Sequence, residues 1–209
     1  MEARDYLKEI IIILIAGIIF GLSFAFPDNS LILYSTISFI IIILLNVITK
    51  KIIAYNLEAD VKTKFWAWHQ YGFRKDSHFK KPLPMLWIPL LLSFLTKGLF
   101  LWLGILETEI TPRTERVSKR HGLYRFSEMS EWHIAWIAVF GIITNLILAI
   151  ISYVFGFEMF SKLNIYFAFW SLIPLGSLDG NKILFGSKSL WFIMFVISLL
   201  FLLWSFVIV

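Results

Sequence analysis

Long apolar runs separated by short polar stretches make up most of this chain. A helix needs about 20 apolar residues to cross the hydrocarbon core of a bilayer, and several runs reach or approach that length. The predicted spans are residues 9–26, 31–49, 133–155, 164–180 and 190–209. The pattern predicts a single membrane-embedded domain over residues 1–209, with the fold of an all-α polytopic membrane protein of about five transmembrane helices.

A further apolar run, residues 84–106, does not fit a simple span, because it contains two prolines, two glycines and Lys97. If it crossed the membrane, the basic loop after it, residues 107–132, would lie on the opposite side from the basic loop of residues 50–81. Lys and Arg favour cytoplasmic loops. We therefore expect a re-entrant or interfacial segment, with an additional span as the alternative. The N-terminus and both basic loops are then cytoplasmic, and the protein is integral to the cell membrane.

The loop of residues 56–81 is polar, basic and rich in aromatic residues. Within it, residues 62–68 alternate partly and contain aromatic β-formers, which fits a short strand. A tryptophan and tyrosine belt at a membrane interface would have the same composition. The sequence is consistent with both interpretations.

Composition excludes several classes of site. The chain is 59% hydrophobic and has no cysteine, which excludes a disulfide framework and a thiolate metal site. Its net charge of +5 comes from loop lysines and arginines, which fits membrane topology and a lipid bilayer as partner, with no nucleic acid. No histidine has a partner histidine three or four residues away, so each is expected to be solvated or interfacial. The histidines are His69, His78, His121 and His133.

Residues 170–185 interrupt an apolar stretch and carry an acid beside the interruption. Pro174, Gly176 and Gly180 break the helical pattern, and Asp179 precedes the last of them. An ionisable residue beside a broken membrane helix is costly and by default marks a functional position. Broken backbone at that depth is tolerated only where protein or a water-filled cavity satisfies its polar groups. Asp179 is therefore expected to face the protein interior.

The sequence of this break resembles a motif of the site-2 protease family, the intramembrane zinc metalloproteases. The family motif reads N-x-x-P-x-x-x-L-D-G. Here Pro174, Leu178, Asp179 and Gly180 match it, and Ser171 stands in place of the asparagine. The resemblance implies a site-2 protease-like core.

A second stretch, in the preceding predicted span, resembles the family's G-P-L-A-N segment. Gly141 and Asn145 match it, and Ile142 replaces the proline. The loop of residues 112–133 also resembles a loop of prokaryotic, particularly archaeal, members. Asn145 either hydrogen-bonds a neighbouring helix, as asparagines in membrane bundles do, or lines a site that faces the break.

The resemblance also implies a chemistry. In the family, the two histidines of H-E-x-x-H and the aspartate of L-D-G bind zinc, and the glutamate is the general base on the zinc-bound water. This chain has no H-E-x-x-H. When the lysine that follows the family's motif is matched to Lys51, Asn46 and Lys50 occupy the two histidine positions and Val47 occupies the glutamate position. Asp179 would be a remnant ligand, and no catalytic residue, zinc ion or other cofactor is expected.

The partner of Asp179 is the central question about this site. A carboxylate in a low-dielectric interior becomes protonated or finds a cation. We expect Lys50 to be that cation, with Lys97 as a competing candidate. Alternatively, Lys50 and Lys51 extend to the cytoplasmic surface, as lysines at helix ends usually do.

Three classes of function remain. The favoured one is a pseudoprotease, which binds a membrane helix or a partner protein in the former substrate groove. The first alternative is an active intramembrane zinc metalloprotease with unconventional ligands, for example Asp179 and a loop histidine, with Glu128 or Glu131 as the base. The second is an unrelated, transporter-like helix bundle in which Asp179 and Lys97 mark an ion path. Transporters usually show paired repeats, and the sequence contains only one broken segment.

Overall fold

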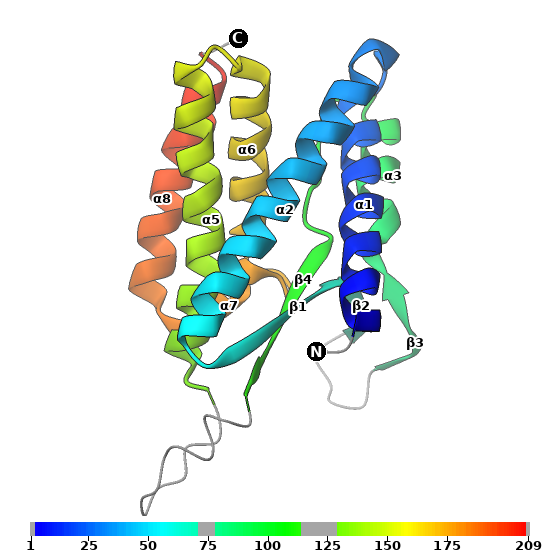
Figure 1. Cartoon of the computed structure of the whole chain (residues 1–209). Helices are drawn as coiled ribbons and strands as arrows, with labels where there is room; N and C mark the ends of the chain where they lie inside the picture. The colour runs from blue at the N-terminus through cyan, green and yellow to red at the C-terminus, as the bar shows by residue number, and fades with distance from the viewer. Residues whose placement is uncertain (1–2, 71–77, 114–128, 208–209) are drawn as a thin grey trace, which may run out of the picture.

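The chain folds into a bundle of helices with strands at one end (Figure 1). The computed structural model describes residues 3–70, 78–113 and 129–207. The helices are α1 (Ala3–Ala25), α2 (Ile32–Asn56), α3 (Ile88–Leu95), α5 (Glu131–Val154), α6 (Glu158–Ser171), α7 (Asp179–Gly186) and α8 (Lys188–Ser205). Among the described helices, four are long and apolar enough to cross a membrane: α1 from Asp5 onward, α2, α5 and α8. The chain is thus a mostly helical membrane protein.

Two predicted spans need correction. The span expected to end at residue 49 belongs to α2, which continues to Asn56, and Lys50 and Lys51 within it both have acidic partners in the protein. The span expected at residues 164–180 has the predicted interruption but different bounds. α6 begins earlier, at Glu158, and ends at Ser171, and α7 begins at Asp179. Proline lacks the N–H that a continuing helix requires, so Pro174 ends the helical stretch.

The expectation of an all-α fold is also incomplete, because strands join the helices. β1 (Ala59–Phe65) pairs antiparallel with β4 (Leu106–Pro112), and β2 (Ala67–Gln70) pairs antiparallel with β3 (His78–Pro84). The strand interpretation of residues 62–68 is therefore right. β4 was not predicted. Thr108 is the one buried residue of β4, so the strand lacks a regular alternation of buried and exposed positions.

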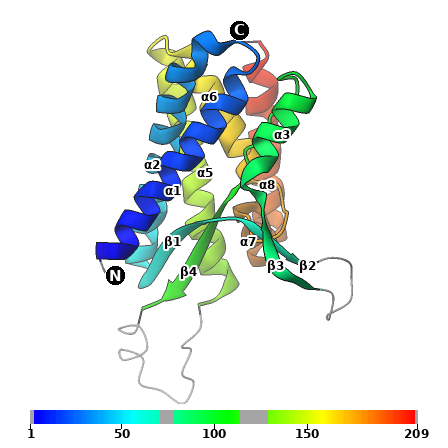
Figure 2. The same cartoon turned by 90° about the vertical axis from the view of Figure 1, so that its right-hand side faces the viewer.

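The apolar segment of residues 84–106 connects two strands, β3 and β4. The chain leaves β3, forms α3 alongside α1, and returns to β4 (Figure 2). It turns at Lys97 and Gly98, both of which have positive φ. At this turn the Gly98 backbone packs closely against the carbonyl of Phe26, which follows α1. Both basic stretches that flank this segment therefore leave from the same end of the bundle.

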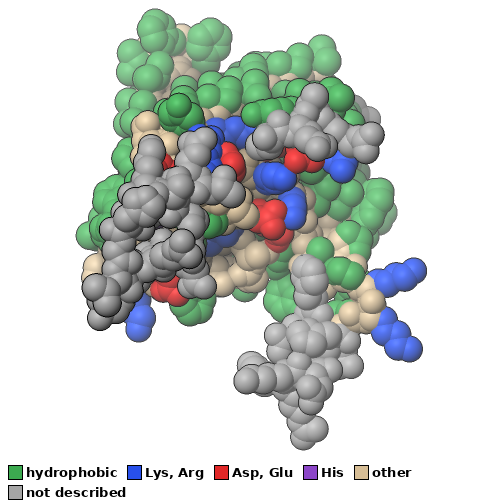
Figure 3. All heavy atoms as spheres, turned by 60° about the horizontal axis from the view of Figure 1, so that its bottom comes forward, with side chains coloured by type: hydrophobic (Ala, Val, Ile, Leu, Met, Phe, Trp, Pro, Cys, Tyr) green, Lys and Arg blue, Asp and Glu red, His purple; other side chains and the backbone are tan. Residues whose placement is uncertain are grey.

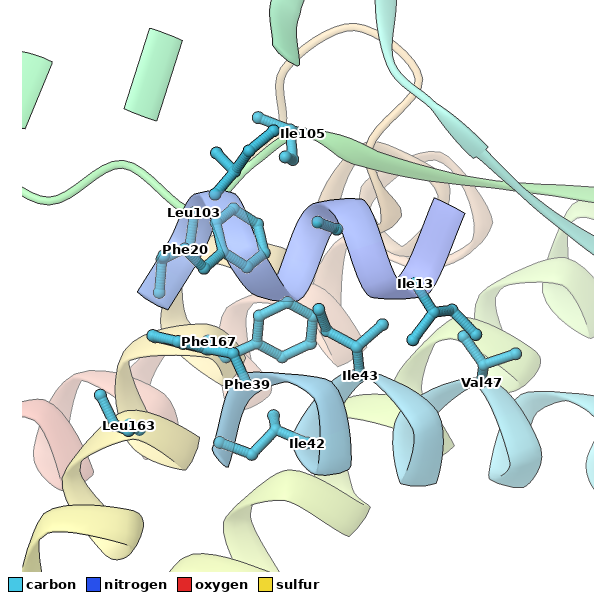
Figure 4. Close-up of a cluster of buried hydrophobic side chains, with 12 residues drawn as sticks. Ile13, Phe20, Phe39, Ile42, Ile43, Val47, Leu103, Ile105, Leu163 and Phe167 are labelled. Atoms are coloured by element: carbon cyan, nitrogen blue, oxygen red, sulfur yellow. The ribbon is translucent and has the colours of Figure 1, made fainter. Parts of the chain in front are cut away.

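Two larger clusters of buried apolar side chains hold the helices together, and a smaller third one lies between α2, β1 and α5. The first joins α1, α2, α6 and the chain before β4, and Figure 4 shows its aromatic centre. There the Phe20 ring centroid lies 5.5 Å from that of Phe39 and 6.1 Å from that of Phe167. The second cluster joins α5, α6, α7 and α8 and includes Leu172. Because Phe167 belongs to one cluster and Leu172 to the other, the α6–α7 break lies where they meet.

Candidate functional site

One face of α2 forms the first wall of the candidate site. Asn46, Val47 and Lys50 are all buried, with exposed fractions of 2%, 5% and 5%. Residues four apart lie on the same side of a helix, so Asn46 and Lys50 stand one above the other. This is the face on which the resemblance described above would place the two histidines of H-E-x-x-H.

The break between α6 and α7 forms the opposite wall, and specific groups satisfy its backbone. Gly176 has a φ of 53° and lies beneath the indole of Trp66. Its carbonyl accepts a hydrogen bond of 2.6 Å from Asn181 Nδ2. The carbonyl of Leu172 accepts one of 3.0 Å from Trp191 Nε1. A non-helical segment beside membrane helices requires such partners.

Gly180 places Asp179 at the start of α7. A β-carbon at this position would collide with the Leu172 carbonyl, so the first turn of α7 packs directly on the end of α6. Leu178, which is 2% exposed, packs over Gly104. With Leu178 and Gly180 both held, the Asp179 side chain is directed towards α2.

Asp179 and Lys50 form a buried ion pair through Asp179 Oδ2 and Lys50 Nζ, and the side chains are 6% and 7% exposed. Lys50 Nζ also donates a hydrogen bond of 3.3 Å to Thr108 Oγ1 of β4. Lys182 Nζ lies 3.6 Å from the other carboxylate oxygen, Oδ1. Desolvating two charges is tolerated when the pair gains such additional polar contacts.

Gly141 of α5 makes room for this ion pair. A β-carbon built on it would lie 2.5 Å from Lys50 Cε and 2.9 Å from Asn46 Nδ2. Real β-carbons essentially never approach other atoms so closely. Position 141 therefore requires a glycine, because α5 lies very close to the Lys50 side chain there.

The two walls enclose a cavity of about 20 Å³. That volume is sufficient for about one water molecule. The polar residues that line it are Asn46, Lys50, Thr63, Thr108, Ser171 and Asp179. Within the described part of the chain, Asn46 Nδ2 and Asp179 Oδ1 have no hydrogen-bond partner. They are a donor and an acceptor that one internal water could join.

Other residues singled out in the sequence have different positions. Lys97 is exposed at the turn after α3, and the ion pairs of Asp179 are with Lys50 and Lys182. Asn145 is fully buried, but it is not among the residues that line the cavity. Its two amide atoms have no hydrogen-bond partner among the described residues. Pro174 is half-buried within the break.

The residues of the active-protease alternative are only partly described. Glu131 is exposed at the start of α5, and the His133 ring contacts Ser130, the N-cap of that helix. His121, Glu128 and the side chains of His69 and His78 lie outside the described residues. Over the ranges that are described, no group of three or more His, Asp or Glu side chains could hold a metal ion.

Sequence reasoning missed three contributors to this site. Thr108 contacts Lys50 from a strand that was not predicted, and Trp66 covers Gly176 across a long sequence separation. Lys182 could have been found, because it lies three residues after Asp179 on the same helix, where side chains meet. No family model, curated protein or solved structure matches this chain at a significant level.

Proposed function

We propose that this protein is a non-catalytic relative of the site-2 proteases, a pseudoprotease of the membrane. The observation that supports this most directly is the shared cavity of Asn46, Lys50 and Asp179. These residues occupy the positions that the resemblance assigns to the three zinc ligands. In this chain a lysine ammonium, paired with Asp179, takes the place of a metal cation.

The chemistry of the replaced positions supports a loss of hydrolysis. Zinc binds deprotonated ligands that have a free lone pair, which a charged ammonium lacks. The Val47 side chain cannot accept the proton that a general base must remove from water. A site with Lys50 and Val47 in these positions can stabilise the fold, but it lacks the general base and the two imidazole ligands of the H-E-x-x-H motif.

A partner helix would lie outside the cavity, which has room for little more than a water molecule. An apolar groove of about 310 Å³ runs between the first half of α2 and the start of α6. Tyr34, Ile37 and Phe160 line it, and Ser38 contributes a small side chain. Small residues let membrane helices approach closely. This groove supports the proposal that the protein binds a membrane helix or a partner membrane protein.

Restoring the family motif tests the first half of the proposal. The triple variant Asn46→His, Val47→Glu, Lys50→His is expected to bind one zinc per chain, whereas the parent protein binds substoichiometric zinc. The readout is the zinc content of purified, monodisperse protein after incubation with zinc and desalting. The matched control is the same triple variant with Asp179→Ala, which should lose the metal.

Two results would contradict the proposal in different ways. Stoichiometric zinc in the parent protein, lost on Asp179→Ala, would favour the active metalloprotease. A triple variant that folds but binds no zinc would remove the kinship with zinc proteases.

Site-directed crosslinking tests the second half. A photoreactive residue at Ile37, in the groove, should give a discrete adduct with a membrane protein in native membranes. The control is the same residue at Ile193 of α8, which is also exposed (53% against 49%) and is not among the residues that line this groove. Equal labelling from both positions would argue against a specific helix-binding groove.

A further inference from the structure

A second, larger pocket of about 340 Å³ opens at the end of the bundle that carries the N-terminus and the strands. It lies between the start of α1, the last turns of α2, β1 and the residue after β4. Tyr6 and Tyr55 stand on its rim, close to the ends of two membrane helices. Tyrosines at such positions typically lie at the level of the lipid headgroups.

Lys51 presents a positive charge to this pocket from α2. Its ammonium pairs with Glu9 and lies 5.0 Å from the centre of the Tyr6 ring. The two partners are not equally accessible: the Lys51 side chain is 29% exposed, and that of Glu9 only 6%. Glu9 also accepts a hydrogen bond of 3.0 Å from the Thr63 backbone N–H. The acid is therefore held inside the protein, while the ammonium reaches the pocket.

Arg113 provides a second positive charge on the other side of the pocket. Its Nε donates a hydrogen bond of 2.8 Å to Asp60 Oδ1, and its guanidinium carbon lies 4.8 Å from the centre of the Tyr55 ring. Asp60 lines the pocket as well, and Glu9 lies behind Lys51, so each of the two cations is paired with one carboxylate and has further N–H donors for an added anion. Figure 3 shows Lys, Arg, Asp and Glu side chains gathered at this end, with hydrophobic side chains around them.

The remaining wall of the pocket is aliphatic and faces outward. Ile48 and Ile52 of α2 line it and are 42% and 57% exposed. α2 is one of the four helices able to cross a membrane, so these side chains lie along the path of lipid acyl chains. Two cations at headgroup depth beside an aliphatic strip match one ligand chemistry, a phosphodiester attached to an acyl chain.

We propose that this pocket binds the headgroup of an anionic phospholipid. The phosphate lies between Lys51 and Arg113, because charge-assisted hydrogen bonds from Lys and Arg are the strongest available for an anion. One acyl chain follows Ile48 and Ile52 along α2. Basic pockets between membrane helices at the headgroup level are a known setting for anionic lipids.

The test compares spin-labelled phosphatidylglycerol with spin-labelled phosphatidylcholine bound to the whole protein in phosphatidylcholine vesicles. An interfacial cation contributes on the order of 1 kcal/mol, which predicts roughly a fivefold preference for the anionic lipid in electron paramagnetic resonance spectra. The double variant Glu9→Gln, Lys51→Gln removes the cation without leaving Glu9 unpaired, and Arg113→Gln removes the other. Each should lower the preference clearly, and only the variant that combines all three substitutions should bring it close to one.

The matched control is Lys64→Gln. Lys64 lies on β1 outside the pocket, is half-exposed, and pairs with Glu109 at 2.6 Å, so this variant removes one positive charge elsewhere, as Arg113→Gln does in the pocket. It should keep the full preference. Equal binding of both lipids by the parent protein would overturn the proposal, as would an equal loss in Lys64→Gln, which would indicate diffuse attraction. Displacement of the lipid by millimolar glycerol phosphate would overturn it too, because the ligand would then be a soluble phosphate.

Discussion

Lys50 and Lys51 are consecutive residues of α2, yet they serve two different regions of the molecule. Consecutive helical residues point about 100° apart. Lys50 therefore turns towards Asp179 and Thr108 between α2, β4 and α7, whereas Lys51 turns towards Glu9 and α1. Both are ion pairs with a buried acid. The Lys50 side chain is 7% exposed and the Lys51 side chain 29%.

This difference in exposure shows what keeps two adjacent lysines inside a membrane helix. Charged residues within membrane segments are costly unless they pair or face a polar interior. Here each lysine has its own acid, contributed by a different element, and α2 continues for another turn beyond them. The inner pair is enclosed by protein, and the outer pair borders an open pocket. Substitutions should therefore have unequal effects in the two regions.

The largest effect is expected for Lys50→Met. It leaves the buried Asp179 carboxylate without its closest cation, and breaking a buried pair in this way costs about 3–5 kcal/mol. The measurement is unfolding in mixed detergent micelles, followed by circular dichroism. The double variant Lys50→Met, Asp179→Leu should recover much of the lost stability, since an apolar replacement of both partners is often neutral. A single variant as stable as the parent protein would show that the pair does not hold α7 to α2.

A smaller decrease in the free energy of unfolding, of about 2 kcal/mol, is expected for Lys51→Met. Glu9 keeps its hydrogen bond from the Thr63 backbone N–H, and water reaches the vacated side through the open pocket. The same unfolding experiment measures it. If Lys51→Met proved more damaging than Lys50→Met, burial would not be what distinguishes the two regions.

Gly141→Ala is expected to lower the free energy of unfolding by about 1–3 kcal/mol, because the new methyl group overlaps Lys50 Cε and Asn46 Nδ2. A double-mutant cycle sharpens the attribution to the inner region. In a Lys50→Ala background the overlap with the lysine chain is gone, so the cost of Gly141→Ala should fall. An unchanged cost would place the strain elsewhere on α5.

The smallest effect is expected for Lys64→Gln. Lys64 and Glu109 form a pair of 2.6 Å on the paired strands, but both side chains are nearly half-exposed. Exposed pairs contribute less than about 1 kcal/mol because water and salt screen them. The unfolding midpoint should hardly change. A loss comparable to that of Lys51→Met would mean that the strands contribute more to stability than their exposure suggests.

The sequence could predict those parts of the fold that depend on local pattern. Apolar run length located the four long helices, and Pro174 with its neighbouring glycines located the break. The spacing of Asn46 and Lys50 predicted that they share a face, and the resemblance to a known motif brought Asp179 opposite them. These inferences require only helical periodicity and residue order.

The remaining features depend on contacts between distant segments. The pairing of Lys51 with Glu9 could not be predicted from local pattern, because Glu9 lies 42 residues before Lys51, just as Asp179 lies 129 residues after Lys50. β4 was missed because its pairing with β1 joins segments more than 40 residues apart, and Thr108 was missed with it. The pocket beside Lys51 is likewise assembled from four elements, none of which indicates it alone.

The N-terminus lies at the strand-bearing end of the bundle, and α8 carries the C-terminus to the other end (Figure 1). If the long axis of the bundle crosses a membrane, we expect these two ends to face opposite sides of it. A reporter enzyme that works only after export, fused to one tail, should be active, and the same enzyme fused to the other tail should be silent.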